Sequence, residues 1–398
     1  MVTPSAPWPA RHGASVRNAA FVTALSKRYD VDVVALCSSR EQALSHPDAR
    51  TTTLVRTKGL SRSRLVLNAA TSRTPQLVFR HRSKEFRAVI QNHLAVGDVN
   101  TVQIEGLQLA HIVNDVASGT EGKWPRPNVV YDAHNVEWHL QSMLAGLSQG
   151  MRAWYSRRQA ALLYDVERWV VSAADATVAA SEADAVALGS IGGREVVAVP
   201  HPVDVSKRMP NAKSESRTPR VLLAANFGYR PNVLGAEWLF GSVWPQVVRR
   251  VPDAVLRVVG PGSSGLRNVA PARCTIGGIV DDFDAEQRRA WVSISPNPVG
   301  SGAPLKVLHS LAQGRPVVVR AEGFAGLPRA LDGVVIADSS EDFADRIVDL
   351  LQDSKRRRLI GRAGRAYVLK HHEPGKTGKM LLQVHERLDC RGARGLGS

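Results

Sequence analysis

The chain has 398 residues, of which 44% are hydrophobic and 22% charged, and its formal net charge is +16. This length suits two globular domains, and the composition excludes a disordered protein. The sequence lacks an apolar run of the roughly 18 to 20 residues that cross a bilayer, and residues 1–4 lack the basic start and apolar stretch of a secretion signal.

The first predicted element is a fragment of a strand. Residues 1–3 supply only the last positions of the strand with which a doubly wound domain begins. Either this strand is short or the true start of the protein lies upstream. A loop over residues 7–13 then leads into a predicted helix over residues 15–28.

Short apolar, β-branched runs recur along the rest of the chain. They predict strands at residues 31–36, 101–104, 129–132, 176–180 and 196–199, and again at 220–224, 254–259, 274–277, 290–294 and 316–319. Further helices are predicted at residues 152–172, 233–251, 305–313 and 341–351. Continuously apolar strands that alternate with helices indicate parallel sheets covered on both faces. Residues 204–218 have the polar composition of a linker, so we expect an α/β fold of two facing doubly wound domains.

One basic stretch stands out in the first half. Residues 56–87 contain nine lysines and arginines and a single acid, Glu85, with apolar residues interleaved. Basic and apolar residues together suit an anionic membrane surface. A pair of solvated helices explains them equally well. Nucleic acid is not expected as a partner, because the stretch lacks the aromatic residues of a single-strand platform and any helix-turn-helix or zinc pattern.

The strongest local pattern runs from Gly300 to Gly314. A predicted strand leads into a glycine-rich loop, a short helix and another strand. Glycines allow a ligand to approach the backbone closely, and the unpaired N–H groups of a helix start bind phosphate. Lys306 lies in the first helical turn, where a cation opposes the helix dipole. A bound anion explains this lysine; the alternative is a tolerated surface lysine.

This segment resembles the donor-binding segment of glycosyltransferase family 4, the retaining group with the GT-B fold of two Rossmann-like domains. The branch that builds bacterial exopolysaccharides is the most similar. The family pattern is matched in order along nearly the whole chain, by residues 12–18, Asp132-Ala133-His134-Asn135-Val136-Glu137, Ser181 and Asp184, residues 226–232, Gly260, Asp281-Asp282, residues 300–316 and residues 323–327. The resemblance implies an acceptor-side domain at 1–205, a nucleotide-sugar domain at 206–372, and a C-terminal helix and tail at 373–398 that packs back on the first domain.

The resemblance also implies the roles of individual residues. Transfer from a nucleotide sugar leaves negative charge on the departing phosphate, which fixed cations and N–H groups stabilise. For His134 and Arg17 the alternatives are a satisfied buried histidine and an arginine that orients the loop or pairs with a surface acid. The residues expected to act in catalysis are His134, Arg230 and Lys306. Those expected to bind the donor are Gly13, Asn226, Gly260, Asp282, Gly300, Ser301, Gly302, Leu305 and His309. Arg17 and Glu105 are expected on the acceptor side.

Some positions depart from the family pattern. His309 stands where the family has the glutamate that accepts hydrogen bonds from the ribose, and an imidazole offers fewer acceptor sites than a carboxylate. Ser301 replaces the other glutamate, and Pro298 and Pro304 replace arginines of the branch. These changes predict weaker or altered donor binding.

Three functional hypotheses follow. The first is a hexosyltransferase-type glycosyltransferase that moves a sugar from a nucleotide-sugar donor to a polysaccharide, lipid-linked or natural-product acceptor, with retention and without metal or other cofactor. The second is a weak or inactive GT-B protein that acts as a binding or partner subunit. The third, a UDP-sugar isomerase, lacks a carboxylate-rich crevice. We expect a cytoplasmic protein, because Cys37, Cys274 and Cys390 have the spacing of reduced thiols; contact with the inner face of the membrane remains an alternative for the basic stretch.

Overall fold

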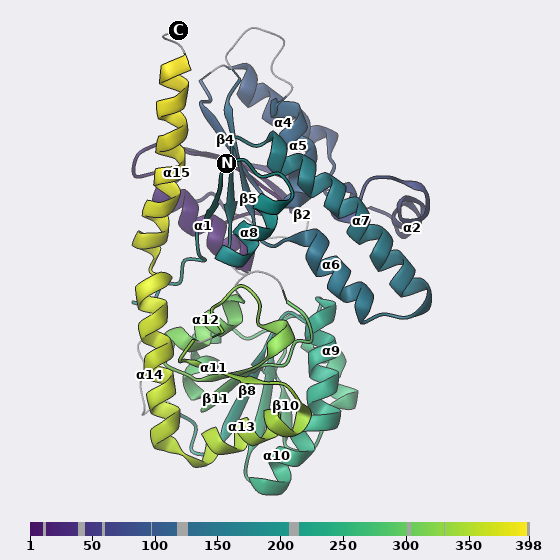
Figure 1. The fold of residues 1–398 in the computed structure, drawn as a ribbon, viewed down its shortest axis with the longest axis vertical. Coiled ribbons are helices and arrows are strands. Elements are labelled where there is room, and N and C mark those ends of the chain that lie inside the picture. The colour runs from purple at the N-terminus through teal and green to yellow at the C-terminus, as the bar shows by residue number, and fades with distance from the viewer. Residues whose placement is uncertain are drawn as a thin grey trace. The chain divides into compact units, whose positions relative to one another are not determined.

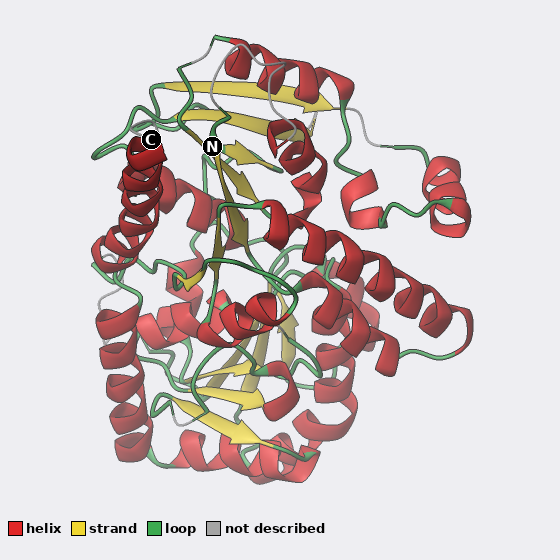
Figure 2. Cartoon of the chain, turned by 45° about the horizontal axis from the view of Figure 1, so that its top comes forward, coloured by secondary structure: helices red, strands yellow, loops and turns green. Residues whose placement is uncertain are grey.

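The structure, a computed structural model, describes the chain apart from residues 11–12, 39–43, 58–59, 97, 118–125, 207–214, 301–303, 330 and 396–398. The chain divides into two compact units (Figure 1). Unit 1 comprises Met1–Pro202 and Pro374–Ser398, and unit 2 comprises Val203–Glu373. Each unit is a parallel sheet between helices (Figure 2).

Unit 1 is built on a seven-stranded sheet of order β3-β2-β1-β4-β5-β6-β7, in which all neighbouring strands are parallel. The strands are β1 (Val2–Thr3), β2 (Asp32–Ser38), β3 (Thr51–Thr57), β4 (Thr101–Glu105), β5 (Asn128–Ala133), β6 (Ala176–Ala179) and β7 (Val196–Ala198). Strand β1 has two residues, yet it pairs with both β2 and β4. These two residues therefore lie at the centre of the sheet.

Helices cover both faces of this sheet. They are α1 (Gly13–Leu25), α2 (Arg62–Thr71), α3 (Gln76–Phe79), α4 (Lys84–Ala95), α5 (Ala110–Ala117), α6 (Glu137–Gly146), α7 (Gly150–Ala173), α8 (Glu182–Ser190) and α15 (Pro374–Gly395). The C-terminal helix α15 packs beside α1, and its Leu381 and Val384 share an apolar core with Phe21 and Val130 (Figure 1). A second core on the opposite face includes Ile104.

Unit 2 repeats this plan with a six-stranded parallel sheet of order β10-β9-β8-β11-β12-β13. Its strands are β8 (Arg220–Ala224), β9 (Val255–Val259), β10 (Cys274–Ile276), β11 (Val292–Ser295), β12 (Val317–Arg320) and β13 (Val334–Ala337). Its helices are α9 (Arg230–Trp238), α10 (Trp244–Arg250), α11 (Phe283–Arg289), α12 (Leu305–Ala312), α13 (Ser340–Gln352) and α14 (Ser354–His371). The α/β fold of two doubly wound units predicted from the sequence is confirmed.

Some elements differ from the expectation, among them helices α5, α6, α8, α11 and α14, which were not predicted. The edge strands β3 and β13 were not predicted. The expected helix over residues 233–251 is α9 followed by a π-helical turn, Leu239–Val243, and α10. Pro245 follows at the start of α10, where a proline cannot donate to the preceding turn. In the π turn the backbone hydrogen bonds reach one residue further than in an α-helix, and the turn separates α9 from α10.

The basic stretch of residues 56–87 spans the end of β3 and the helices α2, α3 and the start of α4. Ser61 and Ser83 cap the starts of α2 and α4, since each side chain accepts a hydrogen bond from a backbone N–H three residues on. The described helices include none with the length and apolarity that crossing a membrane requires.

Candidate active site

The strand orders fix where a ligand would bind in each unit. In open parallel sheets, ligands bind outside the carboxyl ends of the strands, where neighbouring connections run in opposite directions. This point lies between β1 and β4 in unit 1 and between β8 and β11 in unit 2. Each of these points is marked by a cluster of buried polar side chains.

In unit 2 the cluster is formed by Lys306, Asn297 and Asn232. Lys306 is the second residue of α12, Asn297 follows β11, and Asn232 lies in the first turn of α9. The lysine Nζ donates to Oδ1 of Asn297 at 2.8 Å and to Oδ1 of Asn232 at 3.0 Å. The Asn297 amide nitrogen also donates to Oδ1 of Asn232 at 2.8 Å, and the Asn232 amide nitrogen donates to the carbonyl of Asn226 at 2.7 Å.

Among the described residues, the ammonium group of Lys306 donates to two neutral amides and to no carboxylate. Burial lowers the pKa of its ammonium group to about 7, because desolvation disfavours the charged form. The first N–H groups of α12 lie beside it, and a helix start favours anions. The cluster is therefore suited to a phosphate group, whose charge would stabilise the protonated lysine.

Glycines permit the close contacts that form this cluster. A Cβ on Gly235 in α9 would lie 2.7 Å from the Pro296 carbonyl oxygen, directly before Asn297. A Cβ on Gly300 would lie 2.7 Å from the carbonyl oxygen of Gly323. Gly260, after β9, has a φ of 125°, a conformation that favours glycine. These glycines let backbone segments approach one another at the carboxyl end of the sheet.

The structure places the other expected donor residues of unit 2 at this same end. Arg230 is exposed at the start of α9, and the Asn226 side chain accepts from the Gly228 N–H at 2.9 Å. Asp282 caps α11 through the Ala285 N–H at 2.7 Å. The list is completed by Leu305, the first residue of α12, and by His309, whose ring centroid lies 6.1 Å from that of Phe283. Ser301 and Gly302 lie outside the described residues.

In unit 1 the cluster centres on a buried ion pair between Arg17 and Asp132. The Arg17 guanidinium donates to both oxygens of Asp132 at 2.8 Å, and both side chains are 0% exposed. A third bond of 2.9 Å reaches the Val199 carbonyl. The partner of Arg17 is thus an acid, but in the interior rather than on the surface. Gly13, a proposed loop residue, is the first residue of α1.

Glu105 and His134 complete this cluster. Glu105 ends β4, and His134 follows the end of β5, with 2.9 Å between Nε2 of the histidine and Oε2 of the glutamate. The Asn18 amide, oriented with its nitrogen toward the acceptors, donates to the same oxygen at 2.9 Å. His134 is 12% exposed at the side chain, whereas Glu105 is fully buried. The histidine ring is thus the part of the cluster that solvent reaches.

The protonation of this cluster follows from its burial. Burial, with the negative charge of Asp132 nearby, raises the pKa of Glu105 to about 7. Burial alone would raise the pKa of Asp132 too, but Arg17 lowers it. Burial opposes the charged form of His134, but its hydrogen bond to Glu105 and the charge of Asp132 raise the histidine pKa. Glu105 and His134 therefore share one proton near neutral pH.

Among the described residues, Glu105, Asp132 and His134 form one group whose ligand atoms lie within 4.8 Å of one another. Both oxygens of Asp132 already accept from Arg17, and Glu105 accepts from Asn18 and His134. A guanidinium thus occupies the position from which a divalent cation would balance these carboxylates. The donor set fits the arginine better than a metal ion.

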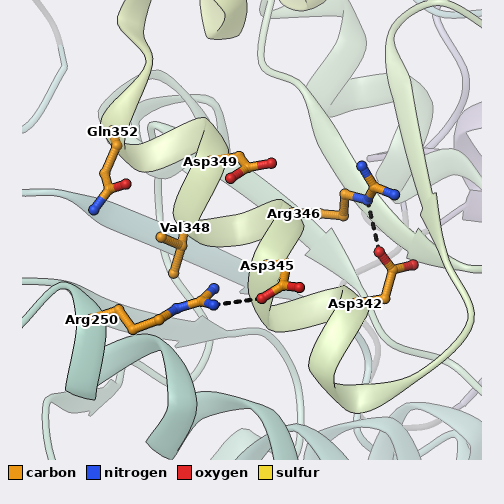
Figure 3. A pocket seen from close by; sticks show the side chains of 7 residues that line it. All are labelled: Arg250, Asp342, Asp345, Arg346, Val348, Asp349 and Gln352. Carbon is orange, nitrogen blue, oxygen red and sulfur yellow. Dashed lines mark hydrogen bonds and ion pairs between the residues drawn. The ribbon is translucent and has the colours of Figure 1, made fainter.

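A groove of about 530 Å³ elsewhere in unit 2 is unrelated to these clusters. It lies along α13 beside the end of α10 (Figure 3). Nη1 of Arg250 is 2.5 Å from Oδ1 of Asp345, and Nε of Arg346 is 2.9 Å from Oδ1 of Asp342. Because α10 ends just before β9 begins, Arg250 lies toward the amino ends of the strands. The groove is lined by paired surface charges, away from the end of the sheet where ligands bind.

Most of the amides in the two clusters come from residues for which the sequence predicts no role: Asn232, Asn297, Asn18 and Gln103. Asn297 stands between two prolines directly after a strand, and Asn232 follows a proline at a helix start. The place of Asn297 after a strand and of Asn232 at a helix start was the available signal. Asn232 contacts Asn297 and Lys306, which lie 65 and 74 residues away in the sequence. Only the fold reveals these contacts.

Comparison with known proteins adds to this geometry. Residues 218–353 match the family described as Glycosyl transferases group 1. This region contains all of the unit 2 strands and the cluster at Lys306. None of the curated proteins matches the chain in sequence.

Several solved structures share the fold over nearly the whole chain. A sucrose-phosphate synthase from Thermosynechococcus elongatus has 15% identity and a TM-score of 0.74, with 98% of this chain and 99% of that chain covered. WaaG, a glycosyltransferase involved in lipopolysaccharide biosynthesis, has 15% identity and a TM-score of 0.65, covering 96% and 99%. Anabaena HepE, solved with UDP and glucose, has 11% identity and a TM-score of 0.64, covering 97% and 99%. The fold is GT-B.

Proposed function

We propose that this chain, which has the GT-B fold and whose second unit matches the glycosyl transferases group 1 family, moves a hexose from a nucleotide-sugar donor to a polysaccharide, lipid-linked or small-molecule acceptor. The observation that carries the proposal is the position of Lys306, held by Asn297 and Asn232 at the start of α12. A lysine beside the start of a helix is suited to bind the diphosphate of such a donor.

The chemistry follows from charge. As the bond between the sugar and the diphosphate breaks, negative charge grows on the leaving phosphate. Lys306 stabilises that charge, with the exposed Arg230 at the start of α9 as a second cation. His134 contacts the sugar or the acceptor through its solvent-facing ring. From the resemblance of the motifs to family 4 and its exopolysaccharide branch, we further propose that the transfer proceeds with retention and without metal.

HepE binds UDP and UDP-glucose, so these are the first nucleotides to test. Nucleotide release from UDP-, GDP- and dTDP-sugars should be slow but measurable in the absence of acceptor, and it should disappear in Lys306→Ala. Release that persists in that variant would place the leaving group elsewhere.

A second candidate is a weak or inactive GT-B protein that binds a nucleotide or a partner subunit. His309 favours this reading, because it stands where the resemblance calls for a ribose-binding glutamate. Binding of nucleotide without release of nucleotide from any sugar donor would support it over the enzyme.

We further propose a cytoplasmic location, with peripheral membrane contact through the basic stretch of residues 56–87 as a secondary role. Its exposed Arg64 and Leu67 on α2 combine charge with apolar surface. Retention on vesicles with anionic lipid at low salt, and loss at high salt, is expected. Failure to bind at low salt would leave the stretch as a solvated face.

A further inference from the structure

The face of the unit 1 sheet that α1 and α15 cover carries a buried polar layer beside its apolar core. Side chains alternate between the faces of a strand, so Gln103 and Glu105 of β4 lie on the same face. Ile104, between them, lies in the apolar core of the other face. The covering helix α15 contributes His385 to this polar layer, and Gln103, Glu105 and His385 are all buried.

These side chains form a continuous chain of hydrogen bonds that ends at His134. His385 Nε2 lies 2.8 Å from Oε1 of Gln103. The Gln103 amide nitrogen donates to Oε1 of Glu105 at 2.6 Å. The other oxygen of Glu105 lies 2.9 Å from Nε2 of His134. The chain joins the C-terminal helix to the partly exposed ring of His134 through two buried residues of one strand.

The chemistry of the groups fixes the direction of these bonds. An ionised carboxylate only accepts, so the Gln103 nitrogen faces Glu105 and its oxygen faces His385. Because that oxygen also only accepts, His385 Nε2 must carry a proton. Burial lowers the pKa of His385 to about 4, which leaves a neutral ring near pH 7. A neutral ring that donates through Nε2 orients the Gln103 amide.

We propose that His385 is a positioning residue that holds the His134 ring in its orientation through Gln103 and Glu105. The effect on the orientation of His134 does not depend on any reaction. Its consequence for catalysis rests on the proposed function. With His385 removed, the Gln103 amide is free to rotate, and Glu105 loses a donor. Its carboxylate is then less stabilised as an anion, and it attracts the His134 proton less strongly.

Other charged groups also affect the protonation of His134, Glu105 and His385, so a test must leave these groups unchanged. Asp132 and Arg17 act on His134, and the α-amino group of Met1 acts on Glu105. Around His385 lie Asp389, the same α-amino group and the Tyr29 ring, whose centroid is 5.9 Å away. Substitutions at Gln103 and His385 leave all of these residues in place.

The test is an NMR titration of the His134 ring in the full chain, with the signal assigned from His134→Gln. In His385→Leu we expect the His134 midpoint to fall by about 0.5 pH units, the size expected for a weakened hydrogen bond. Gln103→Leu should lower it at least as much, and the double variant should match Gln103→Leu. The control is Glu386→Gln. Glu386 lies next to His385 on α15, and the variant loses its exterior ion pair with Arg28.

His385→Gln places an amide N–H at a similar reach and should restore the wild-type midpoint. A midpoint in His385→Leu equal to that of Glu386→Gln would overturn the proposal, as would shifts that add in the double variant. Should His385→Leu not fold, Gln103→Leu and His385→Gln carry the same comparison. If wild-type protein releases no nucleotide from any donor, the proposed function fails, whereas the titration still decides the role of His385.

Discussion

Arg17 and Asp132 form an ion pair of two parallel 2.8 Å hydrogen bonds in the interior of unit 1, with neither side chain exposed. The pair joins α1 to the end of β5, two residues before His134. The Arg17 guanidinium also lies 4.3 Å from the Phe21 ring centroid and bonds the Val199 carbonyl. One side chain thus holds a helix, two strand ends and the cluster of Glu105 and His134 together.

Removal of Arg17 should therefore destabilise unit 1 strongly. Arg17→Ala leaves Asp132 buried without its cation, and a broken buried pair costs about 3–5 kcal/mol of unfolding free energy. Denaturant unfolding, followed by hydrogen exchange of the β5 amides, measures this loss. Arg28→Ala, which removes the exposed partner of Glu386, should cost less than about 1 kcal/mol. Equal losses in the two variants would contradict the account.

Gly235 should be needed for the Lys306 cluster. In Gly235→Ala the new methyl meets the Pro296 carbonyl oxygen at 2.7 Å, so α9 must move away from the loop that carries Asn297. We expect a loss of about 1–3 kcal/mol in stability and at least about tenfold weaker UDP binding, since tenfold corresponds to about 1.4 kcal/mol.

The matched control, Gly241, lies further along the same helical segment, in the π-helical turn. A Cβ on Gly241 would have no neighbour within 4 Å. Gly241→Ala should therefore leave UDP affinity unchanged and stability equal or higher, because alanine favours the helix by up to about 1 kcal/mol. A stronger effect on binding at Gly241 than at Gly235 would refute the packing argument.

Binding of a nucleoside diphosphate should be coupled to proton uptake by Lys306. Its pKa of about 7 leaves the amine mostly neutral at pH 8, and a bound anion raises the pKa again. Calorimetry in buffers of different ionisation enthalpy should show uptake of about 0.9 proton at pH 8 and about 0.1 at pH 6, relative to Lys306→Ala. Uptake that is the same at both pH values would argue against a neutral lysine.

His309 tests whether ribose binding has changed. A glutamate at this position would offer two oxygens to the ribose hydroxyls, where the imidazole offers at most one acceptor nitrogen. His309→Glu should tighten UDP binding by about tenfold, the value of one good hydrogen bond to a charged group. Unchanged or weaker binding, measured by calorimetry, would mean that His309 is adapted to the donor of this protein.

The sequence predicted most of the fold because its buried strands are continuously apolar. The central strands β5, β8 and β9 read as runs of valine and leucine between helices. The edge strand β3, TTTLVRT, exposes Thr51 and Arg56 and carries a mixed pattern, so periodicity did not identify it. In unit 2, the edge strand β13 has four residues. The other edge strands, β7 and β10, were predicted, so an edge position alone does not hide a strand.

Some residues of the candidate site could be predicted from local sequence patterns, and others could not. Residue type and place at a helix start identified Lys306, and place at a strand end identified His134 and Glu105. The amides that hold them, such as Asn297 and Gln103, are ordinary polar residues in sequence, and their function depends on partners distant along the chain. His385 lies 282 residues from Gln103, so a local pattern cannot associate them.

The central claim is that the Lys306 cluster binds the diphosphate of a nucleotide sugar. Calorimetric titration of UDP, GDP and dTDP tests it most directly, with Lys355→Ala as the control, because Lys355 is an exposed lysine at the same second position of α14. We predict that wild type and Lys355→Ala bind at least one of these nucleotides equally well, and that Lys306→Ala binds it at least tenfold more weakly, about 1.4 kcal/mol. Equal affinity in Lys306→Ala, or no binding of any nucleotide by wild type, would contradict the claim.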